Sequence, residues 1–238
     1  MLSLRDVRKT RGTGSQRYSL VIPHLELAAG QQWALLGPSG SGKSTLLDLL
    51  ALSLSPDHAQ CFDFCIGNDR ADISELWRKR RTNQLAALRS RYLGYVLQAG
   101  GLLGYLDVRR NIGLSRQLLE LPDDGTVERL ATQLEIADQL DKRPCALSVG
   151  QRQRVSCARA LAHAPRLLLA DEPTAALDPL NAGQVMHLLL KQARENGTCC
   201  VIATHDEALA RTSGLTPLRI TCQRDSDGGV TAKLEEPG

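Results

Sequence analysis

Aromatic side chains are scarce in this sequence: Phe, Trp and Tyr together make up 3% of its 238 residues. This scarcity excludes a nucleic-acid platform built from stacked aromatic rings and predicts an aliphatic core. Long apolar runs are also missing, because no stretch approaches the roughly 18 residues that a membrane-spanning helix needs. Residues 1–12 lack the apolar segment of a secretory signal. We therefore expect a soluble chain.

A strong charge of one sign is absent too, since 29 Lys and Arg stand against 26 Asp and Glu for a net charge of +3. So small a surplus predicts no polyanion partner, and we expect no nucleic acid to bind. The odd number of cysteines, seven, argues against a secreted disulfide framework and indicates a reducing cytosol. Cys61, Cys65, Cys199 and Cys200 complete no zinc pattern, and we interpret them as small buried hydrophobic residues.

Hydrophobic patterns divide the chain into three kinds of segment. Alternation over residues 1–32 predicts an antiparallel sheet, to which a hairpin within 216–236 contributes. Short continuous apolar runs that end at Asp171 and His205 are typical of buried parallel strands. The pattern from about 86 to 164 is mostly helical and predicts an inserted helical subdomain. We therefore predict an α/β fold with a parallel-sheet core.

A glycine-rich loop carries the first sign of function. Residues 37–44 fit G-x-x-x-x-G-K-[ST] between a predicted strand and a predicted helix, the context of a P-loop NTPase. Backbone N–H groups of such a loop and the following helix N-terminus bind phosphate. Lys43 is expected to bridge the β- and γ-phosphates, and the Ser44 hydroxyl to ligate Mg²⁺. The predicted ATP-binding residues are Gly37, Pro38, Ser39, Gly40, Ser41, Gly42, Lys43, Ser44 and Thr45.

Two carboxylates follow the apolar run at 167–170. Asp171 suits the Mg²⁺ role, directly or through water, and the adjacent Glu172 suits a general base that polarises the attacking water. Acids at a strand end are often only solvated, but a phosphate loop in the same chain gives these two a shared target. We predict that both face the nucleotide.

A third motif lies between these two elements. Residues 147–151 read LSVGQ and are followed by a helical pattern, and here the chain resembles the ATP-binding cassette (ABC) ATPases, whose signature is LSGGQ. The resemblance extends to Gln98 as the Q-loop, Ala176-Leu177-Asp178 as the D-loop and His205 as the switch histidine. It covers nearly the whole chain and implies one cassette domain, residues 1–238. The signature residues are Leu147, Ser148, Val149, Gly150 and Gln151, with Val149 departing from the family's first glycine.

The resemblance implies how these residues are used. Two cassettes pack head to tail around two ATP molecules, so the partner is a second copy or a close relative, and each signature reaches the γ-phosphate held by the opposite subunit. The catalytic residues are then Glu172, His205 and Gln98, and the Mg²⁺ ligands are Ser44, Gln98 and Asp171. Because Ser148 and Gly150 are retained, we expect a functional signature despite Val149.

The resemblance also implies an activity and a setting. Such a chain hydrolyses ATP to ADP and phosphate, and it drives an integral membrane permease encoded separately, on the inner face of the cell membrane. The sequence is most similar to the group of lipoprotein-releasing and macrolide-exporting ATPases, which indicates a bacterial exporter or envelope machine. A soluble ATPase of the iron–sulfur assembly type is the alternative.

Two features stay open at this level. Family members stack an aromatic residue on adenine, and here Tyr18 is one candidate, whereas the usual position aligns nearer Thr10 or Arg11, whose guanidinium also stacks. Tyr18 is equally well explained as an ordinary sheet residue. The basic run at 77–81, WRKRR, fits either a solvated face or contact with acidic lipid head groups.

Overall fold

The computed structural model describes residues 1–67, 69–98, 100–175 and 177–235. Its strands are β1 (Leu2–Arg11), β2 (Tyr18–Leu27), β3 (Gln32–Leu36), β4 (His58–Ile66), β5 (Asp69–Asp72), β6 (Leu93–Val96), β7 (Leu167–Asp171), β8 (Cys199–Ala203), β9 (Thr216–Arg224) and β10 (Val230–Leu234). Its α-helices are α1 (Lys43–Leu50), α2 (Ile73–Arg78), α3 (Thr82–Tyr92), α4 (Val108–Leu118), α5 (Thr126–Gln133), α6 (Val149–Leu161), α7 (Pro179–Glu195) and α8 (Glu207–Thr212).

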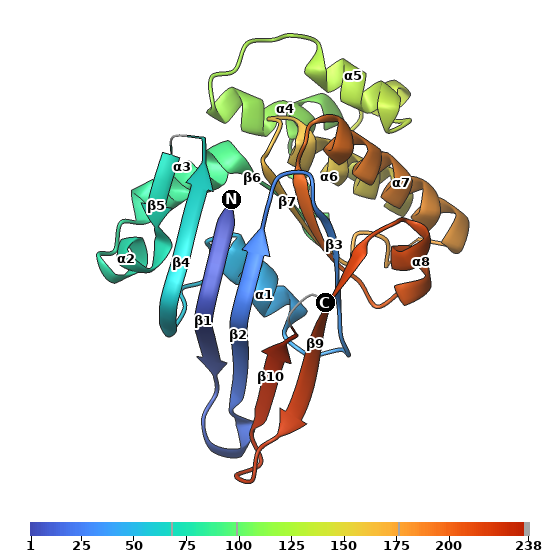
Figure 1. Ribbon diagram of the computed structural model, residues 1–238. Coiled ribbons are helices and arrows are strands. Elements are labelled where there is room, and N and C mark those ends of the chain that lie inside the picture. The colour runs from blue at the N-terminus through green and yellow to red at the C-terminus, as the bar shows by residue number, and fades with distance from the viewer. Residues whose placement is uncertain (68, 99, 176, 236–238) are drawn as a thin grey trace.

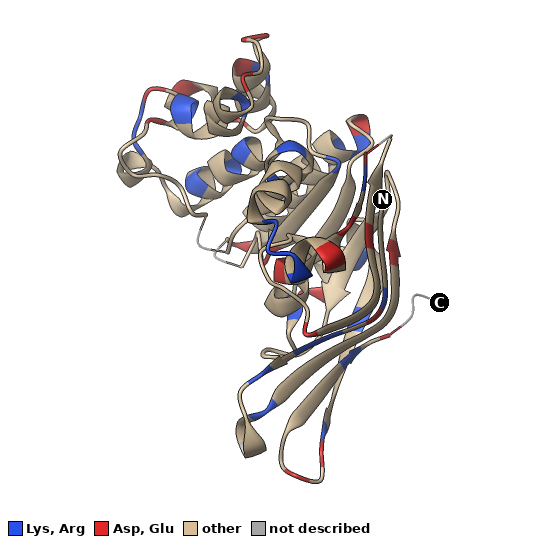
Figure 2. Ribbon diagram, turned by 90° about the vertical axis from the view of Figure 1, so that its left-hand side faces the viewer, with Lys and Arg blue, Asp and Glu red and all other residues tan. Residues whose placement is uncertain are grey.

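All these strands join one mixed sheet in the order β5-β4-β1-β2-β10-β9-β3-β8-β7-β6. Seen from the side, the sheet is strongly curled (Figure 2). The five strands from β9 to β6 are mutually parallel. The predicted α/β class with a parallel core is therefore confirmed.

The parallel strands are apolar throughout because helices cover both of their faces. Along β7, Leu167 and Leu169 pack into the hydrophobic cluster that includes the leucines of α1. The intervening Leu168 and Ala170 pack into a second cluster with α6 and α7. This alternation between two buried faces explains why the run shows no polar period. The carboxyl end of β7, which carries Asp171, lies at the end of the sheet nearest the phosphate loop (Figure 1).

The antiparallel part of the sheet is larger than expected. β1 pairs antiparallel with β2, and β9 with β10, but β10 runs parallel to β2. Residues 58–72, which the sequence pattern leaves outside the predicted antiparallel sheet, form β4 and β5, with β4 paired to β1 and β5 outermost. β4 is half exposed and shows no continuous apolar run that would reveal it. Of the expected C-terminal segment, residue 236 lies outside the described residues.

The helical insertion also has different limits. β6 lies within the span of about 86–164 and pairs with β7 in the parallel core. Its four residues are too few to show a strand period, which is why this strand was not recognised within a span predicted to be mostly helical. Of the helices in this span, α4 and α5 lie at the top of the molecule in Figure 1, beyond the sheet. Helix α5 stops at Gln133, and Glu135 has a positive φ of 56°.

The charged and cysteine side chains are dispersed. Basic and acidic residues are both scattered over the helices and strands (Figure 2), and within residues 77–81 both Arg78 and Lys79 pair with Glu75. Cys199 and Cys200 are buried as expected, whereas Cys65 is exposed and Cys61 half-buried, because both belong to the partly exposed strand β4. Within the described part of the chain, every helix is too short or too polar to cross a membrane.

Candidate nucleotide site

The phosphate loop joins the buried strand β3 to helix α1. Its turn depends on Gly40 and Gly42, which adopt φ values of 76° and 91°, a region that favours glycine. At Gly42 a side chain is also excluded by space, because a Cβ there would lie 1.7 Å from the Tyr18 hydroxyl. Lys43 curls back over the loop, and its Nζ donates to the carbonyl oxygens of Gly37 at 2.7 Å and Pro38 at 3.1 Å.

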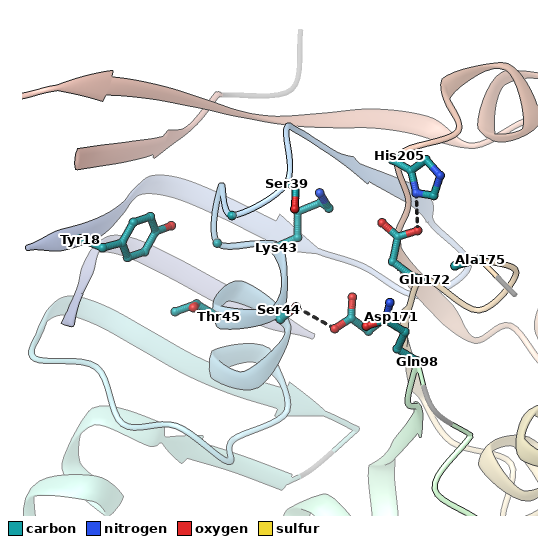
Figure 3. Close-up of a pocket in the computed structure, with 12 residues that line it drawn as sticks. Tyr18, Ser39, Lys43, Ser44, Thr45, Gln98, Asp171, Glu172, Ala175 and His205 are labelled. Atoms are coloured by element: carbon teal, nitrogen blue, oxygen red, sulfur yellow. Dashed lines mark hydrogen bonds and ion pairs between the residues drawn. The ribbon is translucent and has the colours of Figure 1, made fainter. Parts of the chain in front are cut away.

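A cavity of about 470 Å³ opens beside this loop. Segments far apart in the sequence contribute to it: the start of β2, the phosphate loop, the second residue after β6, the end of β7 and the second residue after β8 (Figure 3). Its lining residues are Tyr18, Ser39, Gly40, Gly42, Lys43, Ser44, Thr45, Gln98, Asp171, Glu172, Ala175 and His205. The structure therefore brings the phosphate loop together with Gln98, both carboxylates and the histidine.

One side of the cavity carries oxygen donors. The Ser44 hydroxyl donates to Asp171 Oδ2 at 2.7 Å, and Gln98 lines the same space (Figure 3). Hydroxyl, carboxylate and amide oxygens are ligands that Mg²⁺ accepts, with water and phosphate oxygens completing its shell. Among the described residues no group of three or more His, Cys, Asp or Glu side chains forms a closed metal cage. The donors present thus fit a cation shared with a phosphate ligand.

The cavity also carries an acid–imidazole pair. His205 Nδ1 lies 2.7 Å from Glu172 Oε2, and the Glu172 side chain is only 14% exposed whereas that of His205 is 70% exposed. Glu172 has a φ of 48°, a left-handed conformation that costs a non-glycine residue on the order of 1–3 kcal/mol. Its N–H donates to the Ala203 carbonyl at 3.0 Å, which ties the strained residue to β8. The carboxylate is therefore held in one place.

The signature segment opens helix α6. Ser148 is its N-cap, and its hydroxyl accepts from the Gln151 N–H at 3.2 Å while Gln151 Oε1 accepts from the Ser148 N–H at 2.9 Å. This reciprocal pair satisfies two N–H groups that a helix start leaves free. Val149 is 46% exposed, so its side chain points away from the core without a clash.

A second cavity of about 460 Å³ lies at this helix start. Asp178 borders it and caps α7, and its hydrogen bonds from the Asn181 side chain and from backbone N–H groups hold the pKa of its carboxyl below the ordinary value. The lining residues are Glu135, Ser148, Val149, Gly150, Gln151, Arg154, Leu177, Asp178 and Asn181. Of the predicted D-loop, Ala176 lies outside the described residues.

The two cavities have no lining residue in common, so the structure does not bring the signature to the phosphate loop within one chain. Sequence reasoning missed Glu135, Arg154 and Asn181, although the last two follow the signature and D-loop by only a few positions. For the adenine position, Tyr18 lines the first cavity, whereas Arg11 pairs with Asp48 of α1 at 3.9 Å.

Comparison with known proteins finds relatives over most of the chain. The family described as ABC transporter matches residues 22–175. The lipoprotein-releasing system ATP-binding protein LolD of Paramagnetospirillum magneticum is 40% identical over 213 residues, which cover 88% of this chain and 90% of that protein. The macrolide export ATP-binding/permease protein MacB 1 of Aeromonas hydrophila is 37% identical over 88% of this chain and 32% of that protein.

Solved structures agree with this likeness. The ATP-binding cassette MJ0796, in a dimeric post-hydrolysis state bound to ADP and Pi, matches with a TM-score of 0.78 and 29% identity. The match covers 97% of this chain and 96% of that one.

Proposed function

Because the chain belongs to the ABC transporter family, we propose that it is the ATP-binding and ATP-hydrolysing subunit of a bacterial transporter of the exporter or envelope-machine type. One observation carries the proposal: a single cavity unites the phosphate loop with Asp171, Glu172 and His205. In this assignment residues 1–238 act as one cassette domain that converts ATP and water to ADP and phosphate.

In the proposed mechanism the loop N–H groups and Lys43 hold the β- and γ-phosphates. Ser44, Asp171 and Gln98 would hold Mg²⁺, which when bound neutralises charge on those phosphates. The Glu172 carboxylate accepts the proton of the attacking water, since its position is fixed by the bond from His205 and by its own backbone. The His205 side chain is largely exposed in the cavity, where it would contact the γ-phosphate.

The separation of the two cavities supports a head-to-tail dimer. The signature of one chain cannot reach the phosphate loop of the same chain. In a dimer, Ser148 and Gly150 of a second copy, or their equivalents in a related cassette, would contact the γ-phosphate held by this chain. Asp178 belongs to the same cavity and would face the same junction. Dimeric cassettes among the structural neighbours support this arrangement.

The partner follows from the relatives' names. Their names describe a lipoprotein-releasing system and a macrolide export permease fused to its ATP-binding part. We assign this chain to a complex with a separate integral membrane permease, peripheral on the inner face of the cell membrane. The alternative of iron–sulfur assembly is not favoured, because the most similar curated relatives are transport proteins.

Substitution of the two central residues tests the chemistry. Glu172→Gln should bind ATP, accumulate as an ATP-bound dimer and lose about 10²- to 10⁴-fold in kcat, the range for a positioned proton acceptor. Lys43→Ala should weaken nucleotide binding itself. Steady-state hydrolysis and size-exclusion chromatography with ATP and Mg²⁺ distinguish the two effects. A Glu172→Gln protein that turns over at the parental rate would falsify the general-base assignment.

The partner is tested separately. Tagged Glu172→Gln protein should capture an integral membrane protein from detergent-solubilised membranes of its host in ATP and Mg²⁺. Recovery of soluble proteins alone, with the ATP-bound dimer intact, would contradict the transporter role and leave the catalytic assignments in place.

A further inference from the structure

The chain makes a sharp turn just beyond Gln98, and helix α6 holds that turn. Gly100 and Gly101 have φ values of 72° and 60°, and the Gly100 N–H donates to the Leu97 carbonyl at 2.9 Å. A Cβ on Gly101 would lie 2.8 Å from Leu97 Cδ1. This turn therefore depends on glycine and has little freedom to adjust by itself.

Both glycine carbonyl oxygens are bound by side chains from the middle of α6. The fully buried Ser156 hydroxyl donates to the Gly100 oxygen at 2.9 Å. Arg159 donates to the same oxygen from Nη2 at 3.0 Å and to the Gly101 oxygen from Nη1 at 2.8 Å. A planar guanidinium that spans two adjacent carbonyls fixes their relative orientation, which a single flexible donor does not.

The far end of the same loop is fixed as well. The Asn111 side chain is fully buried, and its amide donates to the carbonyl oxygens of Leu103, Leu106 and Asp107 while its oxygen accepts from the Leu103 N–H. With both ends anchored, the position of α6 sets the position of the turn after Gln98.

Helix α6 also carries Ser148 at its N-terminus, in the second cavity. Between Ser148 and Arg159 the helix extends about 16 Å at 1.5 Å per residue. One rigid element thus connects the cavity that contains the signature to the loop that places Gln98 in the other cavity.

We propose that Arg159 and Ser156 are positioning residues for Gln98, which they hold in place through the carbonyl groups of Gly100 and Gly101. This inference rests on the proposed function, in which Gln98 serves hydrolysis and the signature of α6 meets the ATP of a partner. Loss of the hydrogen bonds from Arg159 and Ser156 to the two glycine carbonyls should leave nucleotide binding intact and displace Gln98.

The test is a double-mutant cycle. Arg159→Gln should lower kcat by about 10- to 100-fold with little change in KM, because misplacing a catalytic group by about 1 Å costs up to about 100-fold. In a Gln98→Ala background the same substitution should cost almost nothing further, since the group it positions is gone. Arg159→Lys should restore part of the activity, and Ser156→Ala should show the same pattern more weakly and keeps the test available if Arg159→Gln does not fold.

Arg116→Gln is the matched control. Arg116 also joins α4 to α6, through the Ala162 carbonyl at 3.0 Å, and makes no contact with the turn after Gln98. Its effect should be equal in both backgrounds. Amide hydrogen exchange over residues 100–107, which needs no activity, should accelerate in Arg159→Gln and remain unchanged in Arg116→Gln.

The outcomes separate the two claims. Equal losses from Arg159→Gln with and without Gln98, or unchanged exchange in the loop, would overturn the positioning role. If the parental protein hydrolyses no ATP while exchange in Arg159→Gln still accelerates, the proposed function is wrong, but Arg159 still holds the loop after Gln98. If Gln98→Ala hydrolyses ATP normally, the role of Gln98 fails and the positioning role fails with it.

Discussion

The hydroxyl of Tyr18 donates a hydrogen bond of 2.7 Å to the carbonyl oxygen of Ser41, in the middle of the phosphate loop. Burial raises the pKa of this hydroxyl well above its ordinary value, so it keeps its proton and remains a donor. The same side chain occupies the space beside Gly42 where a Cβ would lie. The Tyr18 side chain therefore helps to hold the phosphate loop in its conformation, independently of any contact between its ring and adenine.

Tyr18→Phe separates the role of the hydroxyl in holding the loop from the role of the ring in stacking on adenine. Phenylalanine keeps the aromatic face but leaves the Ser41 carbonyl without its partner, which costs about 1 kcal/mol, or about fivefold in nucleotide affinity. We expect that loss in titrations with a fluorescent ATP analogue. Tyr95→Phe, outside the cavity, is the control. Full affinity in Tyr18→Phe together with a large loss in Tyr18→Ala would mean that the ring alone matters.

Gly42→Ala should abolish nucleotide binding. The new methyl group meets the Tyr18 hydroxyl, and the residue would have to keep a φ of 91°, which costs a non-glycine residue on the order of 1–3 kcal/mol. The loop must then change shape. Isothermal titration with ATP and Mg²⁺ should show no heat of binding, while far-ultraviolet circular dichroism should match the parent. Parental affinity would show that the loop tolerates a Cβ and that the contact with Tyr18 is loose.

Substitutions at the start of α6 should differ in effect. Ser148→Ala removes the capping pair with Gln151 and should lower the free energy of unfolding by about 1 kcal/mol, together with a loss of turnover. Val149→Gly alters an exposed side chain and should lower stability by at most about 0.5 kcal/mol, the difference in helix propensity, with turnover near the parental value. Urea unfolding and steady-state hydrolysis measure both. A large gain of turnover in Val149→Gly would indicate that Val149 impairs the signature.

Low pH should weaken the contacts that the Asp124 carboxylate makes at the start of α5. The Asp124 carboxylate accepts hydrogen bonds from Thr126 and pairs with Arg116, and these contacts lower its pKa from 3.8 to about 2. Because the folded pKa lies below the unfolded one, the stabilisation is complete above about pH 4 and disappears as the pH falls through about 2.

The measurement compares melting temperatures of the parent and Asp124→Asn. The difference should be constant from about pH 7 to 5 and shrink below about pH 4. Asp141→Asn serves as control, because the Asp141 side chain is 92% exposed. A difference that stays constant down to pH 2 would contradict the assignment.

The phosphate loop, Asp171, Glu172 and His205 were accessible to sequence reasoning because each lies at the end of a strand that a short apolar run reveals, whereas Ala175 of the same cavity was not. Asp171 ends β7, Glu172 follows it, and the phosphate loop follows β3, so parallel pairing brings them together. Their individual roles stay predictions. The bond from Tyr18 to Ser41 was not accessible, since it joins positions that pattern analysis treats separately.

The missed strands have a common physical cause. β4 is the second strand from the edge and is partly exposed, and its residues show no clean period of burial, so its pattern alone does not separate it from a loop. β6 owes its structure to the neighbouring β7 and to α6 rather than to its own four residues. Tertiary pairing decides both, and a pattern read along the chain does not contain it.

The parallel pairing of β2 with β10 has a consequence for synthesis on the ribosome. Leu20 pairs with Ala232, so the inner edge of the first hairpin stays without a neighbour while nearly the whole chain is made, roughly 10 to 40 seconds at about 5–20 residues per second. An open strand edge over that interval is a template for wrong association. The nascent chain should therefore depend on chaperones until β9 and β10 emerge, and truncation before Thr216 should yield aggregate rather than a smaller folded ATPase.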